Sequence, residues 1–206
     1  MLLSIDPSTT TVGAALFALY EETPRSFLVA ASSIKLDVIE GQDPIQRWTM
    51  AACAVENWLY GVVASKSPAG ITELVFERPQ FYSAVKSKGD PNKLVGVLGV
   101  AAVIAGRLGM RNARRQFTYL PAEWIGQLSK VCPTCKGKAK KKCTDCRGSA
   151  WETPRGRRIA SRLSIDERAA CPDQNDAIDA AGLGLFHLGR LTPRRVYSNG
   201  KDEVQP

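Results

Sequence analysis

The chain begins Met1-Leu-Leu-Ser-Ile-Asp6-Pro-Ser-Thr-Thr-Thr-Val-Gly13, a short apolar run that ends at an aspartate and a polar turn. An apolar run of this length before a proline is typical of a buried strand. Two further apolar runs follow at 12–19 and 26–36, with a polar hairpin at 20–25 between them. The chain is therefore expected to start as a three-stranded meander whose first strand ends at Asp6.

Strands and helices alternate after the meander. This order predicts an α/β fold whose sheet has mixed strand directions. The expected helix at 91–108 is nearly all apolar and rich in Gly and Ala, so it is expected to be buried and closely packed. The expected elements are a helix at 44–64, a fourth strand at 73–76 ending at Glu77, the apolar helix at 91–108, a fifth strand at 116–120, a basic helix at 155–163 and a last helix at 173–188.

Positive charge is concentrated in one part of the 206-residue chain. Twelve Lys or Arg and four Asp or Glu lie between Lys130 and Arg168, a net charge of +8 that equals the charge of the whole chain. Four cysteines that bind zinc as thiolates would subtract about two charges and leave the segment basic. Such a concentration favours contact with a polyanion such as nucleic acid.

Four carboxylates stand where an α/β sheet builds its ligand sites. Asp6 and Glu77 end strands, and Asp173 and Asp176 are expected on one face of the last helix. Oxygen ligands without His or Cys favour Mg²⁺ or Mn²⁺, and two such ions would serve phosphodiester hydrolysis. Taken singly, these acids also fit other roles: a turn at Asp6, a surface pair of Glu77 with Arg78, and a helix cap at Asp173.

The acidic blocks resemble the RuvC family of Holliday-junction resolvases. The matching stretches are Leu-Ser-Ile-Asp6-Pro-Ser-Thr-Thr-Thr-Val-Gly13, Leu-Val-Phe-Glu77-Arg-Pro and Asp173-Gln-Asn-Asp176-Ala-Ile-Asp-Ala-Ala, together with the apolar run at 93–102. The resemblance covers roughly 1–130 and 155–190. It implies an RNase H-like fold with a five-stranded mixed sheet flanked by helices, and it implies that all four acids bind the metal ions.

The same resemblance implies a function. The protein would be a crossover junction endodeoxyribonuclease of DNA recombination and repair, which cuts four-way junctions and leaves 5′-phosphate and 3′-hydroxyl ends. It would act as a homodimer through the apolar helix at 94–104. The chain departs from the family pattern at Ser8, where the family has Gly, and at Asp179, where it has a small apolar residue. Asp179 is a second-choice residue near the metals. The family also has basic residues near the site, and Lys130 is the candidate for such a residue in this chain.

Two aromatic residues, Phe81 and Tyr82, follow Glu77 and precede Lys86 and Lys88. An exposed aromatic side chain with basic neighbours suits stacking on an unpaired base, which is the role the resemblance implies for one of the two. The alternative is that Phe81 packs into the core beneath this loop.

Two CxxC knuckles, Cys132-Pro-Thr-Cys135 and Cys143-Thr-Asp-Cys146, are separated by seven residues. This spacing predicts one structural Zn²⁺ in a Cys₄ site. The knuckles are also similar to DnaJ-type repeats, and a protein-contact role or a redox pair are further alternatives. The basic residues expected to contact DNA phosphates are Lys140, Lys141, Lys142, Arg155, Arg157 and Arg158.

The predicted layout is a nuclease domain at 1–190, interrupted by the zinc-binding insertion at 131–148, with a polar tail at 191–206. No apolar run reaches the roughly 20 residues needed to span a membrane, so no membrane partner is expected. The first residues lack the basic start of a signal peptide, and a cytoplasmic location is therefore expected.

Three other functions fit part of the sequence. An ATPase of the actin and sugar-kinase type has a similar phosphate-binding hairpin, but it needs a second hairpin and about twice the chain. A non-catalytic, zinc-bearing DNA-binding protein would keep the fold only, and the intact acidic set argues against it. A broader branched-DNA nuclease, acting on forks and flaps, fits the same site.

Overall fold

The computed structural model describes residues 1–20, 26–64, 70–79, 91–109, 115–124, 134 and 155–191. Its strands are β1 (Leu2–Asp6), β2 (Thr11–Leu19), β3 (Ser26–Lys35), β4 (Glu73–Glu77) and β5 (Arg115–Tyr119). Its helices are α1 (Pro44–Ala64), α2 (Pro91–Ile104), α3 (Pro121–Trp124), α4 (Arg155–Ala160), α5 (Ile165–Ala169) and α6 (Asn175–His187), with a π-helical turn, Ala105–Gly109, directly after α2.

The five strands form one mixed sheet in the order β3-β2-β1-β4-β5. The meander pairs β1 with β2 and β2 with β3 antiparallel, whereas β4 lies parallel to both β1 and β5. Parallel neighbours need a crossover connection, and in this chain α1 lies between β1 and β4, and α2 between β4 and β5. The predicted α/β fold with a five-stranded mixed sheet is confirmed.

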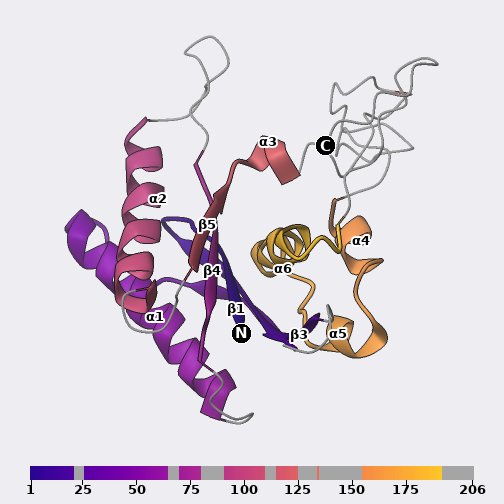
Figure 1. The fold of residues 1–206 in the computed structure, drawn as a ribbon. Coiled ribbons are helices and arrows are strands. Elements are labelled where there is room, and N and C mark those ends of the chain that lie inside the picture. The colour runs from indigo at the N-terminus through magenta and orange to yellow at the C-terminus, as the bar shows by residue number, and fades with distance from the viewer. Residues whose placement is uncertain are drawn as a thin grey trace.

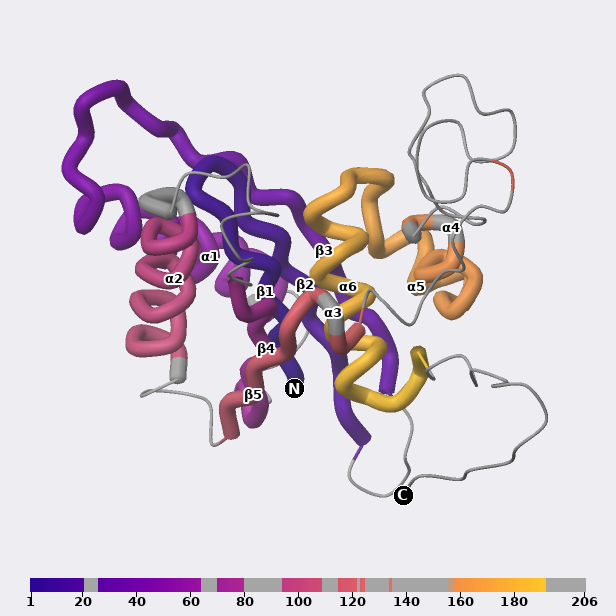
Figure 2. The backbone as a smooth tube through the Cα atoms, turned by 90° about the horizontal axis from the view of Figure 1, so that it is seen from above, coloured from indigo at the N-terminus to yellow at the C-terminus, as the bar shows by residue number. Residues whose placement is uncertain are grey.

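Helices lie on both faces of the sheet (Figures 1 and 2), and each face has its own hydrophobic core. Successive side chains of a strand point to opposite faces. In β1, Leu2 packs in the core beneath α6, whereas Leu3 packs in the core beneath α1 and α2. Both residues are fully buried. The side chain of Asp6 therefore shares its face with Leu2, on the α6 side.

Helix α2 was expected to be buried and closely packed, and the structure buries one of its faces. Its Gly99 lies against the indole ring of Trp48 in α1, where a Cβ atom would overlap the ring. The face of α2 opposite the fully buried Val100 and Ile104 is open, since Val95 is 53% exposed and Leu98 39%. An all-apolar helix does not reveal which of its faces is covered, so the prediction of burial is confirmed for one face and wrong for the other. No helix in the described ranges is long and apolar enough to cross a membrane.

The last third of the described chain holds more, shorter helices than expected. The expected helix at 155–163 ends at Ala160, and α5 follows from a Ser164–Glu167 capping box. Helix α6 begins at Asn175, two residues after the expected start. Leu191, the first residue of the predicted tail, is 3% exposed and packs in the α6 core. Residues 192–206 lie outside the described part.

A buried ion pair fastens α5 to the end of α6 and to β3. Glu167 is 1% exposed, and its carboxylate accepts hydrogen bonds from Arg190 and from the backbone N–H groups of Ser164 and Leu28. Burial works to raise the pKa of this carboxyl, but the hydrogen bonds outweigh it and hold the pKa at about 2. The charged form of Glu167 therefore stabilises the fold.

Glu167→Gln is expected to lower the free energy of unfolding at pH 7 by about 2–3 kcal/mol, because the pair with Arg190 is lost. Since the folded-state pKa lies below the unfolded value, this contribution is present above about pH 4.5 and is lost as pH falls toward 2. Urea unfolding at pH 7 and pH 3 measures it. The difference between wild type and variant should shrink at pH 3, while Asp166→Asn, an exposed neighbour, should show little difference. A difference that does not change with pH contradicts the assignment.

Candidate active site

Two acidic side chains lie next to each other at one end of the sheet. β1 and β4 run parallel with Ile5 paired to Phe76, so the next residues along, Asp6 and Glu77, end the two strands side by side. Glu77 shares its face with Val75, which packs in the α6 core, so both carboxylates are on the α6 side of the sheet. Both residues are half-buried.

The first turn of α6 brings a third acid to this end of the sheet. Gly13 of β2 pairs with Asp6 on one side and with Ser33 of β3 on the other. The backbone carbonyl of Asp176 lies so close to Gly13 that a Cβ atom there would overlap it. The Asp176 carboxylate accepts a hydrogen bond of 3.0 Å from the Ser33 hydroxyl. Ser33, Gly13, Asp6 and Glu77 thus occupy one line across four strands, with Asp176 above it.

The other two acids occupy different environments. Asp173 is exposed and precedes Gln174, the N-cap of α6, so the expectation that Asp173 and Asp176 share one helical face was wrong. Asp179 lies one turn after Asp176 inside the helix and is 8% exposed. The pair spaced i and i+3 on the helix is therefore Asp176 with Asp179.

Trp124 is a site residue that the sequence did not reveal. Its indole N–H donates a 2.9 Å hydrogen bond to the Glu77 carboxylate, and the side chain is fully buried against Gly182 of α6. A buried tryptophan needs a hydrogen-bond partner for its N–H, and this need is the signal that could have pointed to Trp124 from the sequence. The bond fixes one oxygen of Glu77 in place.

Cys171 lies two residues before Asp173. Burial raises the pKa of its thiol to about 11, and the charge of Asp173 adds to the shift. The thiol stays protonated near neutral pH, so Cys171 adds no thiolate beside the acids.

The donors at this end of the sheet suit a hard divalent cation, because they are carboxylates. Within the described ranges, no three His, Cys, Asp or Glu groups lie close enough together to hold one ion as they stand. The Asp176 carboxylate turns to Ser33, across Gly13 from Asp6. Asp6 and Glu77 are thus the neighbouring pair, and Asp176 is the third ligand only if its side chain turns away from Ser33.

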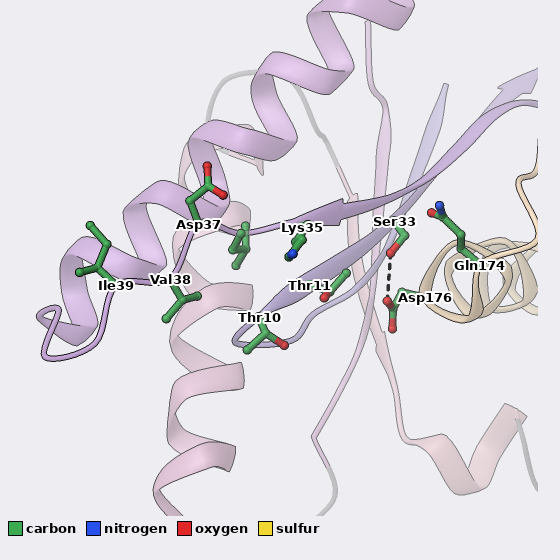
Figure 3. Close-up of a pocket in the computed structure, with 10 residues that line it drawn as sticks. Thr10, Thr11, Ser33, Lys35, Asp37, Val38, Ile39, Gln174 and Asp176 are labelled. Atoms are coloured by element: carbon green, nitrogen blue, oxygen red, sulfur yellow. Dashed lines mark hydrogen bonds between the residues drawn. The ribbon is translucent and has the colours of Figure 1, made fainter.

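An open groove begins at Asp176 and runs along the end of β3 (Figure 3). Its volume is about 810 Å³. The turn between β1 and β2 forms one wall, tied to β3 by a 2.9 Å hydrogen bond from the Leu36 N–H to the Thr10 carbonyl. The lining residues are Thr10, Thr11, Ser33, Lys35, Leu36, Asp37, Val38, Ile39, Gln174 and Asp176.

Most residues expected to bind DNA or zinc lie outside the described residues. Arg158 alone has a described side chain: it is half-exposed on α4, a helix that packs against α6 through Gly156 and Ile159. The residues outside are Phe81, Tyr82, Lys86, Lys88, Lys130, Cys132, Cys135, Lys140, Lys141, Lys142, Cys143 and Cys146, together with the side chains of Arg155 and Arg157.

Comparison with known proteins connects this fold to junction resolvases. No protein-family model and no curated protein sequence matches the chain. Among solved structures, Thermus thermophilus RuvC in complex with a Holliday junction substrate is similar at 18% identity and a TM-score of 0.52, over 90% of this chain and 91% of that one. A second structure of Thermus thermophilus RuvC is similar at 17% identity and a TM-score of 0.53, over 90% of this chain and 92% of that one. The yeast mitochondrial Holliday junction resolvase is similar at 10% identity and a TM-score of 0.51, over 92% of this chain and 77% of that one. The chain therefore has the RuvC-like, RNase H-like fold.

Proposed function

We propose that this chain is a metal-dependent, structure-selective DNA endonuclease that cuts four-way junctions. One observation carries the proposal: Asp6 and Glu77 end adjacent parallel strands, and α6 seats Asp176 on the strand beside them. The fold shared with junction resolvases supports the choice of substrate. The reaction would be hydrolysis of one phosphodiester in each of two opposed strands, giving 5′-phosphate and 3′-hydroxyl ends.

Asp6, Glu77 and Asp176 are the proposed ligands of two Mg²⁺ or Mn²⁺ ions, with Asp173 completing the set. When bound, the ions would supply water activation and neutralise charge that develops on the phosphate. Carboxylates at this spacing repel one another, and a divalent cation relieves that repulsion. Trp124 holds Glu77 in position, and the Asp176 carboxylate, which is bonded to Ser33, would turn toward the ions when they bind. Asp179, behind Asp176 on the helix, remains the second-choice acid.

A homodimer is part of the proposal. Val95 and Leu98 lie three residues apart on α2 and leave apolar surface exposed, as an interface helix does before pairing. Two copies joined through 94–104 would present two active sites to one junction. Phe81 or Tyr82 would stack on a base at the junction centre, and the basic residues of 130–158 would contact phosphates.

Cleavage of an end-labelled four-way junction tests the proposed function, with matching linear duplex and Y-fork as controls and Mg²⁺ or Mn²⁺ present. Paired, symmetric cuts in the junction alone are the expected result, and they require two active sites per junction. Equal cutting of forks would widen the substrate to branched DNA in general. Tight junction binding without cutting under either metal would overturn the nuclease assignment in favour of a non-catalytic DNA-binding protein.

The four knuckle cysteines are proposed to hold one structural Zn²⁺. Purified protein is expected to contain about one zinc per chain by atomic emission, because a Cys₄ set closes the tetrahedral coordination sphere. Cys143→Ser should lose most of that zinc, while Cys53→Ser, which changes a free cysteine in α1, should retain it. Zinc content unchanged by Cys143→Ser would rule out this ligand set.

A further inference from the structure

Lys35 stands in the groove beside the acidic site with no role in that site. It is the last residue of β3, pairs with Thr11 of β2, and is exposed. Among the groove's lining residues it is the one cation, facing two acids, Asp37 and Asp176. Figure 3 shows its amine between Asp176 at one end and Val38 and Ile39 at the other.

The charge of Lys35 is not used within the described part of the chain. The ion pairs of the described residues include Arg107 with Glu56, Arg115 and His187 with Glu73, and Arg190 with Glu167, and none of these involves Lys35. Neither Asp37 nor Asp176 is within 4.0 Å of the Lys35 amine, although both line the same groove. A lysine that served only to balance those acids would be expected to pair with one of them.

The position of Lys35 relative to the acids follows from the strand. Ser33 and Lys35 are two residues apart on β3, so their side chains lie on the same face, about 7 Å apart along the strand. Ser33 donates its hydroxyl to Asp176. Lys35 is therefore further than Ser33 from the acids along the groove.

The rest of the groove supplies two kinds of contact. The hydroxyls of Thr10 and Thr11 and the amide of Gln174 are hydrogen-bond donors around the amine. Beyond it, Val38 is 37% exposed and Ile39 66% exposed, which is apolar surface suited to a sugar ring. A cation surrounded by neutral hydrogen-bond donors, with the apolar surface of Val38 and Ile39 beside it, fits a ligand in which anionic and less polar groups alternate.

We propose that this groove binds the DNA strand next to the phosphodiester that is cut, with Lys35 contacting one backbone phosphate and Val38 and Ile39 packing on the adjoining deoxyribose. The inference rests on the proposed function for the location of the cut, at Asp6, Glu77 and Asp176. Lys35 is then a positioning residue, because it holds the strand in register with the acids without touching the reacting atoms.

The test is equilibrium binding of a four-way junction by the full chain, with Ca²⁺ in place of Mg²⁺, over a series of salt concentrations. Lys35→Ala should weaken binding about eightfold at 0.1 M monovalent salt. The negative slope of log affinity against log salt should become shallower by about 0.9, as for one lost phosphate contact. Lys35→Arg should restore both. Asp37→Asn, which removes an acid from the groove, should tighten binding more than Glu40→Gln, which removes one outside it.

A second measurement locates the contact on the DNA. Junctions in which one phosphate at a time is replaced by an uncharged methylphosphonate should weaken wild-type binding at several positions. At one position beside the cut, Lys35→Ala should be insensitive to the replacement, which is the coupling expected of a direct pair. Unchanged affinity and salt slope in Lys35→Ala, or no insensitive position, overturns the inference.

Cutting by wild type in Mg²⁺, read on the same junctions, keeps the two proposals separate. Wild-type cutting with normal Lys35→Ala binding leaves the nuclease standing and removes the groove assignment. Failure of wild type to cut, together with the reduced slope in Lys35→Ala, supports the groove as a phosphate site and removes the nuclease. A wild-type chain that binds no DNA overturns both.

Discussion

Asp6→Asn is expected to lower the rate of junction cleavage by roughly a thousandfold or more, about 4 kcal/mol in the barrier, with little change in junction affinity. Asparagine has nearly the same shape but lacks the charge that draws a divalent cation. Asp6 is the central acid of the site, because its strand pairs with Gly13 beneath Asp176 on one side and runs beside Glu77 on the other. No other acid in the described residues adjoins both.

The measurement is single-turnover cleavage of the labelled junction in Mg²⁺, with binding measured separately. Glu40→Gln removes the same charge from an exposed position outside the groove and should cut at the wild-type rate. Circular dichroism checks that Asp6→Asn is folded. Cleavage by Asp6→Asn within about tenfold of wild type, less than 1.4 kcal/mol, would mean that the chemistry does not depend on this carboxylate.

The sheet was largely predictable because short apolar runs between polar turns have few alternatives. The predicted boundaries of β1, β2 and β4 lie within one residue of the observed ones, and the acids at the ends of β1 and β4 follow from those boundaries. That Asp6 and Glu77 lie side by side was not readable from the residues alone. It depends on β4 pairing in parallel with β1 across the connection through α1, a long-range choice with no local signal.

Helix ends were the least predictable feature of the site. Asp173 was expected to start the last helix, since aspartate favours the first turn. In the structure the helix begins after Gln174, which makes no side-chain cap. The contact of the first turn with Gly13 is a tertiary constraint that local preference does not contain. The consequence is chemical: Asp179, not Asp173, is the helical neighbour of Asp176.

The covered face of α2 and the partner of Trp124 were missed for the same reason. An apolar sequence indicates that a segment is buried but not which other element covers it. Neither the exposure of Val95 nor the hydrogen bond from Trp124 to Glu77 could therefore be predicted from the sequence. Which polar group pairs with a buried donor depends on the tertiary packing and not on the local sequence. The residues that orient a carboxylate are therefore harder to find from sequence than the carboxylate itself.

Gly13→Ala is expected to be the most damaging change outside the acids. A single methyl group here would overlap the carbonyl carbon and oxygen of Asp176 and press on Ala180, all in α6. Two of these atoms are backbone, so the clash cannot be relieved by a side-chain rotation, and the start of α6 must lift from the sheet. Overpacking of this kind costs about 1–3 kcal/mol of stability. Because Asp176 would move with the helix, the folded variant should also cut about 100-fold more slowly than wild type.

Urea unfolding and single-turnover cleavage together test this, with Gly61→Ala as the matched control. Gly61 lies in α1, where a Cβ atom meets nothing, so the same substitution should stabilise the protein by about 0.5–1 kcal/mol and leave cleavage unchanged. Gly13→Ala that is destabilised but cuts normally at a temperature where it is folded would show that α6 need not rest on β2 for Asp176 to act. Loss of cleavage in the folded variant would instead show that a backbone contact sets the position of this carboxylate, which makes Gly13 as necessary to the site as a ligand.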